Sequence, residues 1–183
     1  MIYPIVVYGD PVLRKRADDI EKGSDVKQLV LDMFETMRSA SGIGLAAPQI
    51  GMSIRLFVVD GSPLEEPELS GFRKVFINAK IVERDGKPIV MEEGCLSIPG
   101  VRDDVQRPDS ITVNYYDEHW KEYTETYEGM KARIIQHEYD HIEGVLFTDH
   151  LTAFKKRIIK NKLVNISRGK VSADYRLKIP VKR

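Results

Sequence analysis

The stretch QHEYDH, residues 136–141, contains two histidines four positions apart, with a glutamate directly after the first. Met130 and Ile134 precede His137 at spacings of seven and three residues, so the histidines continue an apolar stripe along one side of a predicted helix. Residues i and i+4 lie one turn apart, so both imidazoles can bind one metal ion. Glu138 lies near the same edge, where a carboxylate can take a proton from water on the metal. The stretch predicts an inward-facing helix with a metal site.

An ordinary helix whose two histidines form hydrogen bonds within the protein is the alternative interpretation. Two imidazoles without partners would be costly on a buried apolar stripe, and this favours the metal site. A catalytic site of this kind needs a third protein ligand and one open position. The third ligand must therefore come from outside residues 136–141.

Cys95 is the remaining candidate for that ligand. His119 lies in a predicted exposed turn, and His150 comes three residues after the position of the third histidine in metzincins. The helix predicted at residues 151–164 has no acidic residue to bind a metal, as a glutamate does in thermolysin-like enzymes. A thiolate binds zinc or ferrous iron strongly, and Gly94 beside it permits close approach of the backbone. Considered alone, this cysteine would more often be a small buried core residue.

The rest of the chain predicts short strands and two further helices. Apolar residues at helical spacing predict a helix at residues 26–41, with Ser24 or Asp25 as its N-cap. The glycines and proline of residues 42–49 predict an irregular loop, and residues 61–71 predict an exposed connection. β-branched and aromatic runs predict strands at residues 54–59, 74–77, 81–83, 89–91, 110–116, 122–127 and 175–179.

These elements predict an α+β fold in one domain, residues 1–183. Mostly antiparallel short β-sheets would pack around the central helix that carries the HExxH pattern, with further helices toward the N- and C-terminal ends.

Charge and cysteine content limit the partners and the cellular location that we expect for the protein. Lys plus Arg and Asp plus Glu each number 28, so we expect no steering to DNA and no membrane partner. The N-terminal apolar run is broken by Pro4, and this fits neither a signal peptide nor a membrane span. A single cysteine predicts a reducing, cytoplasmic location. The basic run Lys155–Lys162 favours a solvated helix face, and contact with ribosomal RNA is the alternative.

Three segments of the chain form an ordered set of motifs. They are GIGLAAPQ at residues 42–49, EGCLS at residues 93–97 and QHEYDH at residues 136–141. Their order and spacing resemble the bacterial peptide deformylases, and the resemblance extends from Val12 to about Leu151. It implies a hydrolase that removes the formyl group from the N-terminal formylmethionine of newly synthesised polypeptides and releases formate.

By position, the resemblance implies a role for the residues of the second and third motifs. Cys95, His137 and His141 would hold one divalent metal ion, and Glu138 would be the general acid and base. The metal in the family is often ferrous iron, and zinc, nickel or cobalt can occupy the site.

The resemblance also implies how charge and substrate are bound. The Gln49 amide and the Leu96 N–H would stabilise the oxyanion, although Gln49 could instead be a plain loop residue. Small or apolar residues are the candidates for substrate binding, and the apolar ones could equally be plain core residues. These candidates are Ile43, Gly44, Gly94, Met130 and Ile134.

Two other functions remain open from the residues alone: a metallopeptidase that cuts internal amide bonds, and a binding module that a metal merely stabilises. Asp140 and Arg102 are candidates to orient the metal ligands, and the alternative for each is a solvated charge. The acidic insertion at residues 64–69 and the tail after Val164 differ from the shortest family members. These departures concern surface contacts and not the chemistry.

Overall fold

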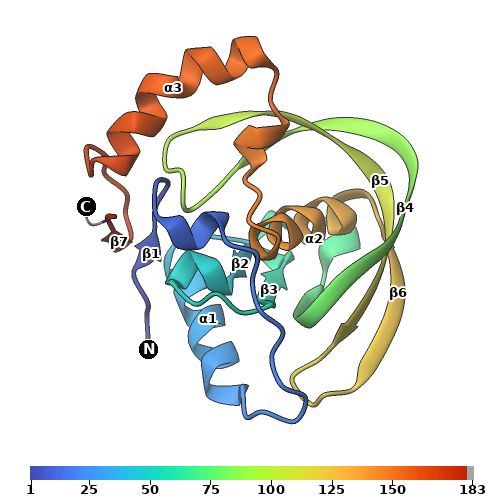
Figure 1. Ribbon diagram of the computed structural model, residues 1–183. Helices are drawn as coiled ribbons and strands as arrows, with labels where there is room; N and C mark the ends of the chain where they lie inside the picture. Colours follow the sequence, from blue (N-terminus) through green and yellow to red (C-terminus); the bar gives the residue numbers. More distant parts are fainter. Residues whose placement is uncertain (181–183) are drawn as a thin grey trace.

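The α2 helix (Gly129–Ile142) lies inside the curve of a five-stranded antiparallel sheet in the computed structural model, which describes residues 1–180 (Figure 1). The strand order in this sheet is β2-β3-β4-β5-β6. Its strands are β2 (Gly44–Ala46), β3 (Leu56–Asp60), β4 (Arg73–Gly94), β5 (Arg102–Tyr116) and β6 (Glu122–Glu128). The α+β class is confirmed, and the helix that carries both histidines is at its centre.

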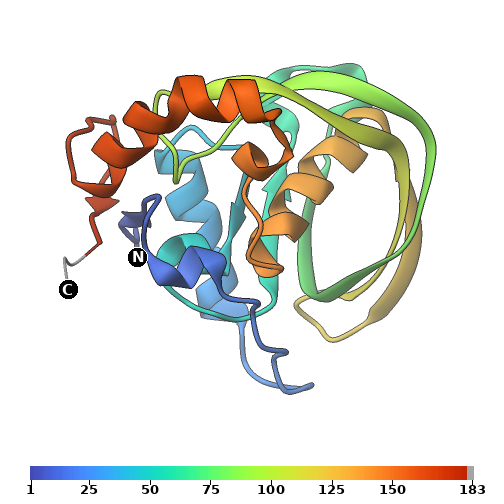
Figure 2. The same ribbon diagram turned by 45° about the horizontal axis from the view of Figure 1, so that its top comes forward.

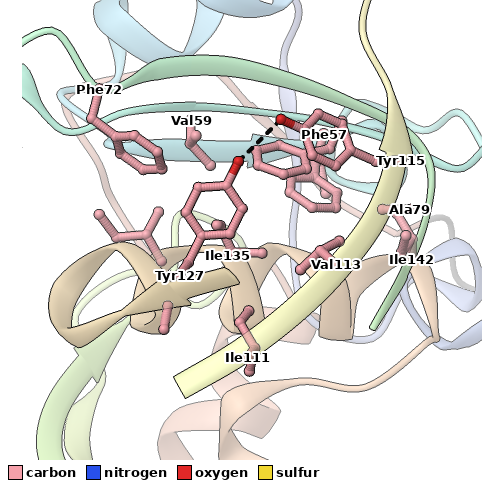
Figure 3. Packing of buried hydrophobic residues seen from close by; sticks show 14 of the residues in the cluster. Phe57, Val59, Phe72, Ala79, Ile111, Val113, Tyr115, Tyr127, Ile135 and Ile142 are labelled. Carbon is pink, nitrogen blue, oxygen red and sulfur yellow. Dashed lines mark hydrogen bonds between the residues drawn. The ribbon is translucent and has the colours of Figure 1, made fainter. Parts of the chain in front are cut away.

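Strand β3 supplies apolar side chains to two hydrophobic cores. Phe57 packs in the core with Ile135 of α2 (Figure 3). Its ring stacks on Phe76 of β4 with 4.7 Å between the ring centroids. Leu56 and Val58 face α1 (Lys27–Ser39) instead. Successive side chains of a strand point to opposite sides, so both faces of this part of the sheet are buried. Each fully buried side chain of this size stabilises the fold by about 1.5–3 kcal/mol. The sheet is therefore a packed support for α2.

Strand β4 is much longer than predicted. Residues 81–83 and 89–91 are not separate short strands but parts of one strand that pairs with β5 on both sides of Gly86. The prediction was wrong because residues 85–87 resemble a turn, whereas here they form an irregularity at which the register shifts between Asp85 and Pro88. Pairing with β5 resumes beyond this irregularity, so the long-range ladder overrides the local turn signal.

The prediction of an irregular loop at residues 42–49 was also wrong. Residues 44–46 form the edge strand β2, and one 3₁₀ turn follows at residues 47–50. Leu45 is completely buried and pairs with Val58 of β3, so burial and pairing impose strand geometry on a stretch of glycine and alanine.

The predicted helices and the strands β3 and β6 are confirmed with small shifts at their ends, but β5 begins at Arg102, eight residues before the predicted start, because it pairs with the long β4. The predicted N-cap of α1 was wrong: the N-cap is Val26, and the Asp25 carboxylate accepts from the Lys27 N–H. Helix α3 (Ala153–Ser167) begins after the N-cap Thr152. The connection at residues 61–71 is mostly exposed, but it buries Leu69. Within residues 1–180, no helix combines the length and apolar character needed to cross a membrane.

The segment predicted as a closing strand forms the short strand β7 (Leu177–Lys178). It pairs in parallel with β1 (Ile5–Val6), which the sequence did not predict as a strand. Helix α3 runs along the outside of the molecule and connects the segment after α2 to this strand pair (Figures 1 and 2). The first and last strands of the chain therefore lie side by side.

Candidate metal centre

Two elements bring Cys95, His137 and His141 together. Cys95 directly follows the last residue of β4, and the two histidines lie one turn apart on α2. One potential ligand atom from each of the three residues lies within 4.8 Å of the others. The Cys95 Sγ is 3.3 Å from the His141 Nε2. The structure therefore brings together the three residues that the sequence predicted as a cluster.

The polar atoms around the cluster fit a bound cation. Within residues 1–180, Glu138 Oε2 is buried beside the cluster without a hydrogen-bond partner. Leaving a buried polar atom unpartnered typically costs about 1–3 kcal/mol, which indicates that a further group belongs in the site. A thiolate with two imidazoles is a donor set suited to zinc or ferrous iron.

The charges of the cluster also favour a cation. Burial raises the pKa of the Cys95 thiol, but His141 and His137 outweigh this effect and lower that pKa to about 5. Burial lowers the pKa of His137, whereas its contacts with Cys95 and Glu93 raise it well above the usual value. The surroundings of His137 thus stabilise a positive charge, which a metal ion can supply in place of a proton.

Glu138 lies directly against Gly44 of the edge strand β2. A Cβ atom on residue 44 would be 2.3 Å from Glu138 Oε1, so only glycine leaves the carboxylate where it is. Burial raises the pKa of Glu138 to about 7, and the nearby imidazoles reduce this effect. A carboxyl group that titrates near neutral pH can both accept and donate a proton.

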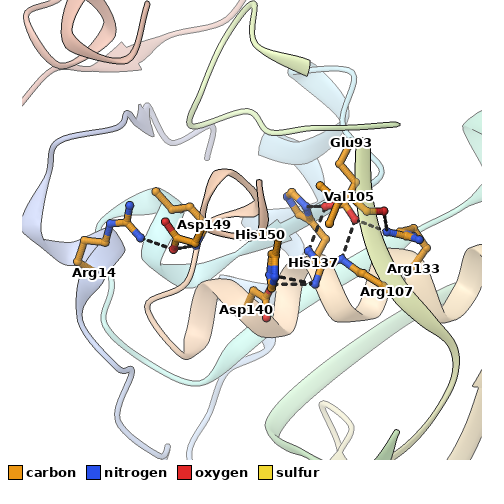
Figure 4. A network of polar contacts seen from close by, with 10 residues as sticks. Arg14, Glu93, Val105, Arg107, Arg133, His137, Asp140, Asp149 and His150 are labelled. Carbon is orange, nitrogen blue, oxygen red and sulfur yellow. Dashed lines mark hydrogen bonds and ion pairs between the residues drawn. The ribbon is translucent and has the colours of Figure 1, made fainter. Parts of the chain in front are cut away.

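The buried Glu93 carboxylate orients His137 (Figure 4). His137 Nδ1 lies 3.0 Å from Glu93 Oε2, and because a carboxylate can only accept, Nδ1 carries the hydrogen. The Nε2 lone pair therefore stays available for a metal. Arg107 donates to both oxygens of Glu93, and Arg133 donates to Oε1 at 2.8 Å. Burial raises the pKa of Glu93, but the bonds from His137 and Arg107 hold it far below its ordinary value.

Gln49 is buried next to Cys95, in the 3₁₀ turn after β2. The Ala46 N–H donates to Gln49 Oε1 at 2.9 Å, and this bond fixes which end of the amide is oxygen. The amide nitrogen therefore faces the cluster, 3.2 Å from Ser97 Oγ and 3.5 Å from Cys95 Sγ.

The candidate substrate-binding residues fall into two groups. Ile134 is buried in the core between α2 and the sheet, and Ile43 and Met130 pack against the border of that core. Gly44 contacts Glu138, whereas a Cβ atom on Gly94 would be 2.7 Å from Arg102 Nη1.

The two candidates for orienting the ligands differ in position. Arg102 pairs with Glu92 at the surface, which agrees with the alternative interpretation of Arg102 as a solvated charge. Asp140 instead binds Arg107 at 2.8 Å and His150 at 2.7 Å, so its side chain is linked to the candidate ligand His137 through Arg107 and Glu93. His119 is exposed in a turn, as predicted.

Sequence reasoning missed the residues that hold the site from outside: Glu93, Arg107 and Arg133. Glu93 is the first letter of the cysteine motif, and its place beside Gly94 and Cys95 was a usable signal. The two arginines carry no local signal, because only the pairing of β4 with β5 and the packing of α2 bring them to Glu93.

These features define an α+β metallohydrolase in which one helix supplies two histidines and a glutamate and a strand end supplies a thiolate. The family model described as polypeptide deformylase matches residues 2–157. The peptide deformylase of Cytophaga hutchinsonii is 58% identical over 184 residues, covering 100% of both chains. That of Christiangramia forsetii is 51% identical and covers 98% of this chain and 97% of its own.

Solved structures agree with the sequence relatives. The crystal structure of the peptide deformylase from Thermus thermophilus superposes with a TM-score of 0.83 at 40% identity, covering 93% of this chain and 100% of that one. The enzyme from Legionella pneumophila gives a TM-score of 0.81 at 39% identity, covering 93% and 98%. The chain belongs to the polypeptide deformylase family. It is a metal-dependent hydrolase that removes the N-formyl group from nascent polypeptides.

Replacing Glu93 by Gln should destabilise the protein by about 3–5 kcal/mol, because the buried Arg133 guanidinium loses its countercharge and Arg107 keeps only that of Asp140. Urea unfolding at neutral pH measures this loss. The matched control is Glu92→Gln, whose exposed pair with Arg102 should contribute less than about 1 kcal/mol.

The stabilisation by Glu93 should also depend on pH. Since the folded-state pKa of Glu93 is lowered, its stabilisation is present at neutral pH and is lost in acid. The difference between parent and variant should therefore narrow below about pH 4.3. Equal losses in the two variants would contradict the central place of Glu93.

Proposed function

We propose that Cys95, His137 and His141 hold the metal ion of this deformylase and that Glu138 is its general acid and base. The meeting of the thiol with the two imidazoles beside a buried, unpartnered carboxylate is the observation that supports this assignment. When bound, the ion supplies Lewis acidity toward water and toward the formyl carbonyl. The whole chain, residues 1–183, would act as one catalytic domain.

Glu138 would move the protons of the reaction. It accepts a proton from the attacking water and later delivers one to the amine that leaves as the C–N bond breaks. Its pKa of about 7 suits both steps near neutral pH. Gly44 permits this position of the carboxylate, because any side chain at residue 44 would displace it.

Gln49 and the Leu96 N–H would donate hydrogen bonds to the oxyanion that develops on the formyl oxygen. The Gln49 amide nitrogen faces the cluster, as such a donor must. Donors that are already oriented stabilise the transition state without reorganisation, and losing one typically costs a factor of about 10²–10³ in rate.

Specificity would have two sources. Ile43, Met130 and Ile134 would supply the apolar surface for the methionine side chain beside α2, since all three belong to or border one apolar core. Gly44 and Gly94 belong to strand ends where an extended substrate backbone can add to the sheet. The formyl carbon carries only hydrogen, so a tight wall near Gly44 and the Cys95 loop would exclude an acetyl group. One extra methyl group discriminates by only about 1–3 kcal/mol.

We propose ferrous iron as the ion in the cell and the cytoplasm as the location. A thiolate with two imidazoles accepts Fe²⁺, and zinc, nickel or cobalt would fit the same donor set. A cytoplasmic location agrees with formylated nascent peptides as substrates.

We further propose a transient contact with the ribosome through Lys155–Lys162 on α3. Most cations of this run are exposed, and the exposed apolar residues Phe154 and Ile158 lie on the same helix. A cluster of cations on the outside of the molecule suits the phosphate backbone of RNA.

Glu138→Gln should lower kcat on a formyl-Met peptide by about 10²–10⁴ and should leave the metal content unchanged, because the amide keeps the shape but cannot carry the proton. Formate release from formyl-Met, acetyl-Met and unblocked peptides measures activity and specificity together. Glu128→Gln, an exposed change at the start of the same helix, is the control and should be fully active. Cleavage of internal bonds by the parent, or full activity of Glu138→Gln, would contradict the proposal.

Cys95→Ser should weaken metal affinity by more than about tenfold, a loss that even outer partners of a ligand can produce. Anaerobic purification with elemental analysis, followed by competition with a chelator, measures it. Iron should be the main metal in the parent, and Glu138→Gln should have the same metal content as the parent. An unchanged metal content in Cys95→Ser would mean that another residue is the third ligand.

Replacing Lys156, Arg157 and Lys160 by Ala should weaken cosedimentation with ribosomes at low salt and leave hydrolysis of a short formyl peptide unchanged. Binding of the parent should decline as salt rises. The matched control changes three exposed lysines elsewhere, Lys27, Lys87 and Lys121. Equal binding by both triple variants would remove α3 as the contact.

A further inference from the structure

Tyr175 connects the C-terminal tail to the cysteine motif. Its hydroxyl donates a hydrogen bond to the Leu96 carbonyl oxygen at 2.8 Å. Burial raises the pKa of Tyr175 to about 12, so the hydroxyl keeps its proton at neutral pH. The match to the family model ends at residue 157, so this contact comes from a part of the chain outside that match.

Strand pairing holds the tyrosine in place. Strand β7 begins two residues after Tyr175 and pairs with β1, and the Ile5 N–H donates to the Arg176 carbonyl at 2.8 Å. The Tyr175 and Leu96 side chains pack against the same hydrophobic core, the one beneath α1. The tail is therefore anchored by strand pairing after Tyr175 and by packing of the tyrosine ring.

The carbonyl groups of residues 95–97 each accept a hydrogen bond from a different part of the chain. The Ile98 N–H donates to the Cys95 carbonyl at 2.9 Å, and the Tyr8 N–H donates to the Ser97 carbonyl at 2.8 Å. Tyr175 holds the carbonyl between them. These bonds fix the peptide planes on both sides of Leu96.

Fixed peptide planes determine where the Leu96 N–H points. The peptide bond is planar and trans, so this N–H points away from the Cys95 carbonyl, which faces Ile98. Rotation of the next peptide plane would turn the Leu96 carbonyl away from Tyr175. The Leu96 N–H lies in the plane that contains the Cys95 carbonyl, and Tyr175 holds the next plane, which joins the first at the Leu96 Cα. Loss of the tyrosine hydroxyl therefore frees the plane next to the donor, and rotation there reaches the donor through the Leu96 backbone dihedrals.

We propose that Tyr175 is a positioning residue for deformylation: through the Leu96 carbonyl it holds the Leu96 N–H in the direction that the developing oxyanion requires. This inference rests on the oxyanion role proposed above for Leu96. It assigns the tail a part in the chemical step. Because the oxyanion forms only in the transition state, loosening its donor lowers kcat and leaves KM unchanged.

Tyr175→Phe tests the proposal, since it removes the hydroxyl and keeps the ring. With a formyl-Met peptide we expect kcat to fall roughly tenfold, less than the 10²–10³ for loss of a whole donor, with unchanged KM and metal content. The matched control is Tyr123→Phe, which removes a hydroxyl bonded to Asp117 at 3.2 Å at the β5–β6 turn. The control should keep parental kcat and KM even where both variants unfold at a slightly lower temperature.

A spectroscopic measurement separates positioning from general stability. In ¹⁵N-labelled, zinc-loaded protein, the amide resonances of Leu96 and Ser97 should shift and exchange faster in Tyr175→Phe and stay parental in Tyr123→Phe. Parental kcat in Tyr175→Phe, a change in KM alone, or equal kinetic loss in both tyrosine variants would overturn the proposal. Glu138→Gln, measured in the same series, separates failure of the Tyr175 proposal from failure of the proposed function. If Glu138→Gln is inactive while Tyr175→Phe keeps parental kcat, only the Tyr175 proposal is wrong. An active Glu138→Gln contradicts the proposed function itself.

Discussion

The buried Glu93 carboxylate holds together the three elements on which the site depends. It lies at the second-last position of β4, two residues before Cys95, it binds Arg107 of β5, and it binds Arg133 and His137 of α2. Buried charge is tolerated only where it is paired and hydrogen-bonded, so strand, neighbouring strand and helix must keep their relative positions. The thiol and the imidazoles lie on different elements, and their distances follow from this shared carboxylate.

The sequence was most informative where chemistry and periodicity coincide. The spacing of His137 and His141 on an apolar stripe predicted both the helix and the site, and the missing ligand led to Cys95. The continuity of β4 could not be predicted, because the turn-like residues 85–87 are overruled by pairing with β5. The contact of Tyr175 with Leu96 joins positions 79 residues apart, and no local pattern encodes it.

The three motifs also depend on one another physically. Gly44 of the first motif has no side chain, and this leaves room for Glu138 of the third. Gln49 of the first motif points its amide nitrogen at Cys95 and Ser97 of the second. A change in one motif therefore moves a group that belongs to another, and effects of combined substitutions here should not be additive.

The pairing of β1 with β7 has a consequence for folding. It joins Ile5 to Leu177, nearly the whole length of the chain, whereas β4, β5, β6 and α2 follow one another closely in sequence. Closing a long loop costs more entropy than closing a short one, so contacts between distant residues tend to form late. We expect the ion-pair centre to assemble early and the contacts between the chain ends to come last. A partly folded molecule would then already contain the ligand cluster before its reaction geometry is complete.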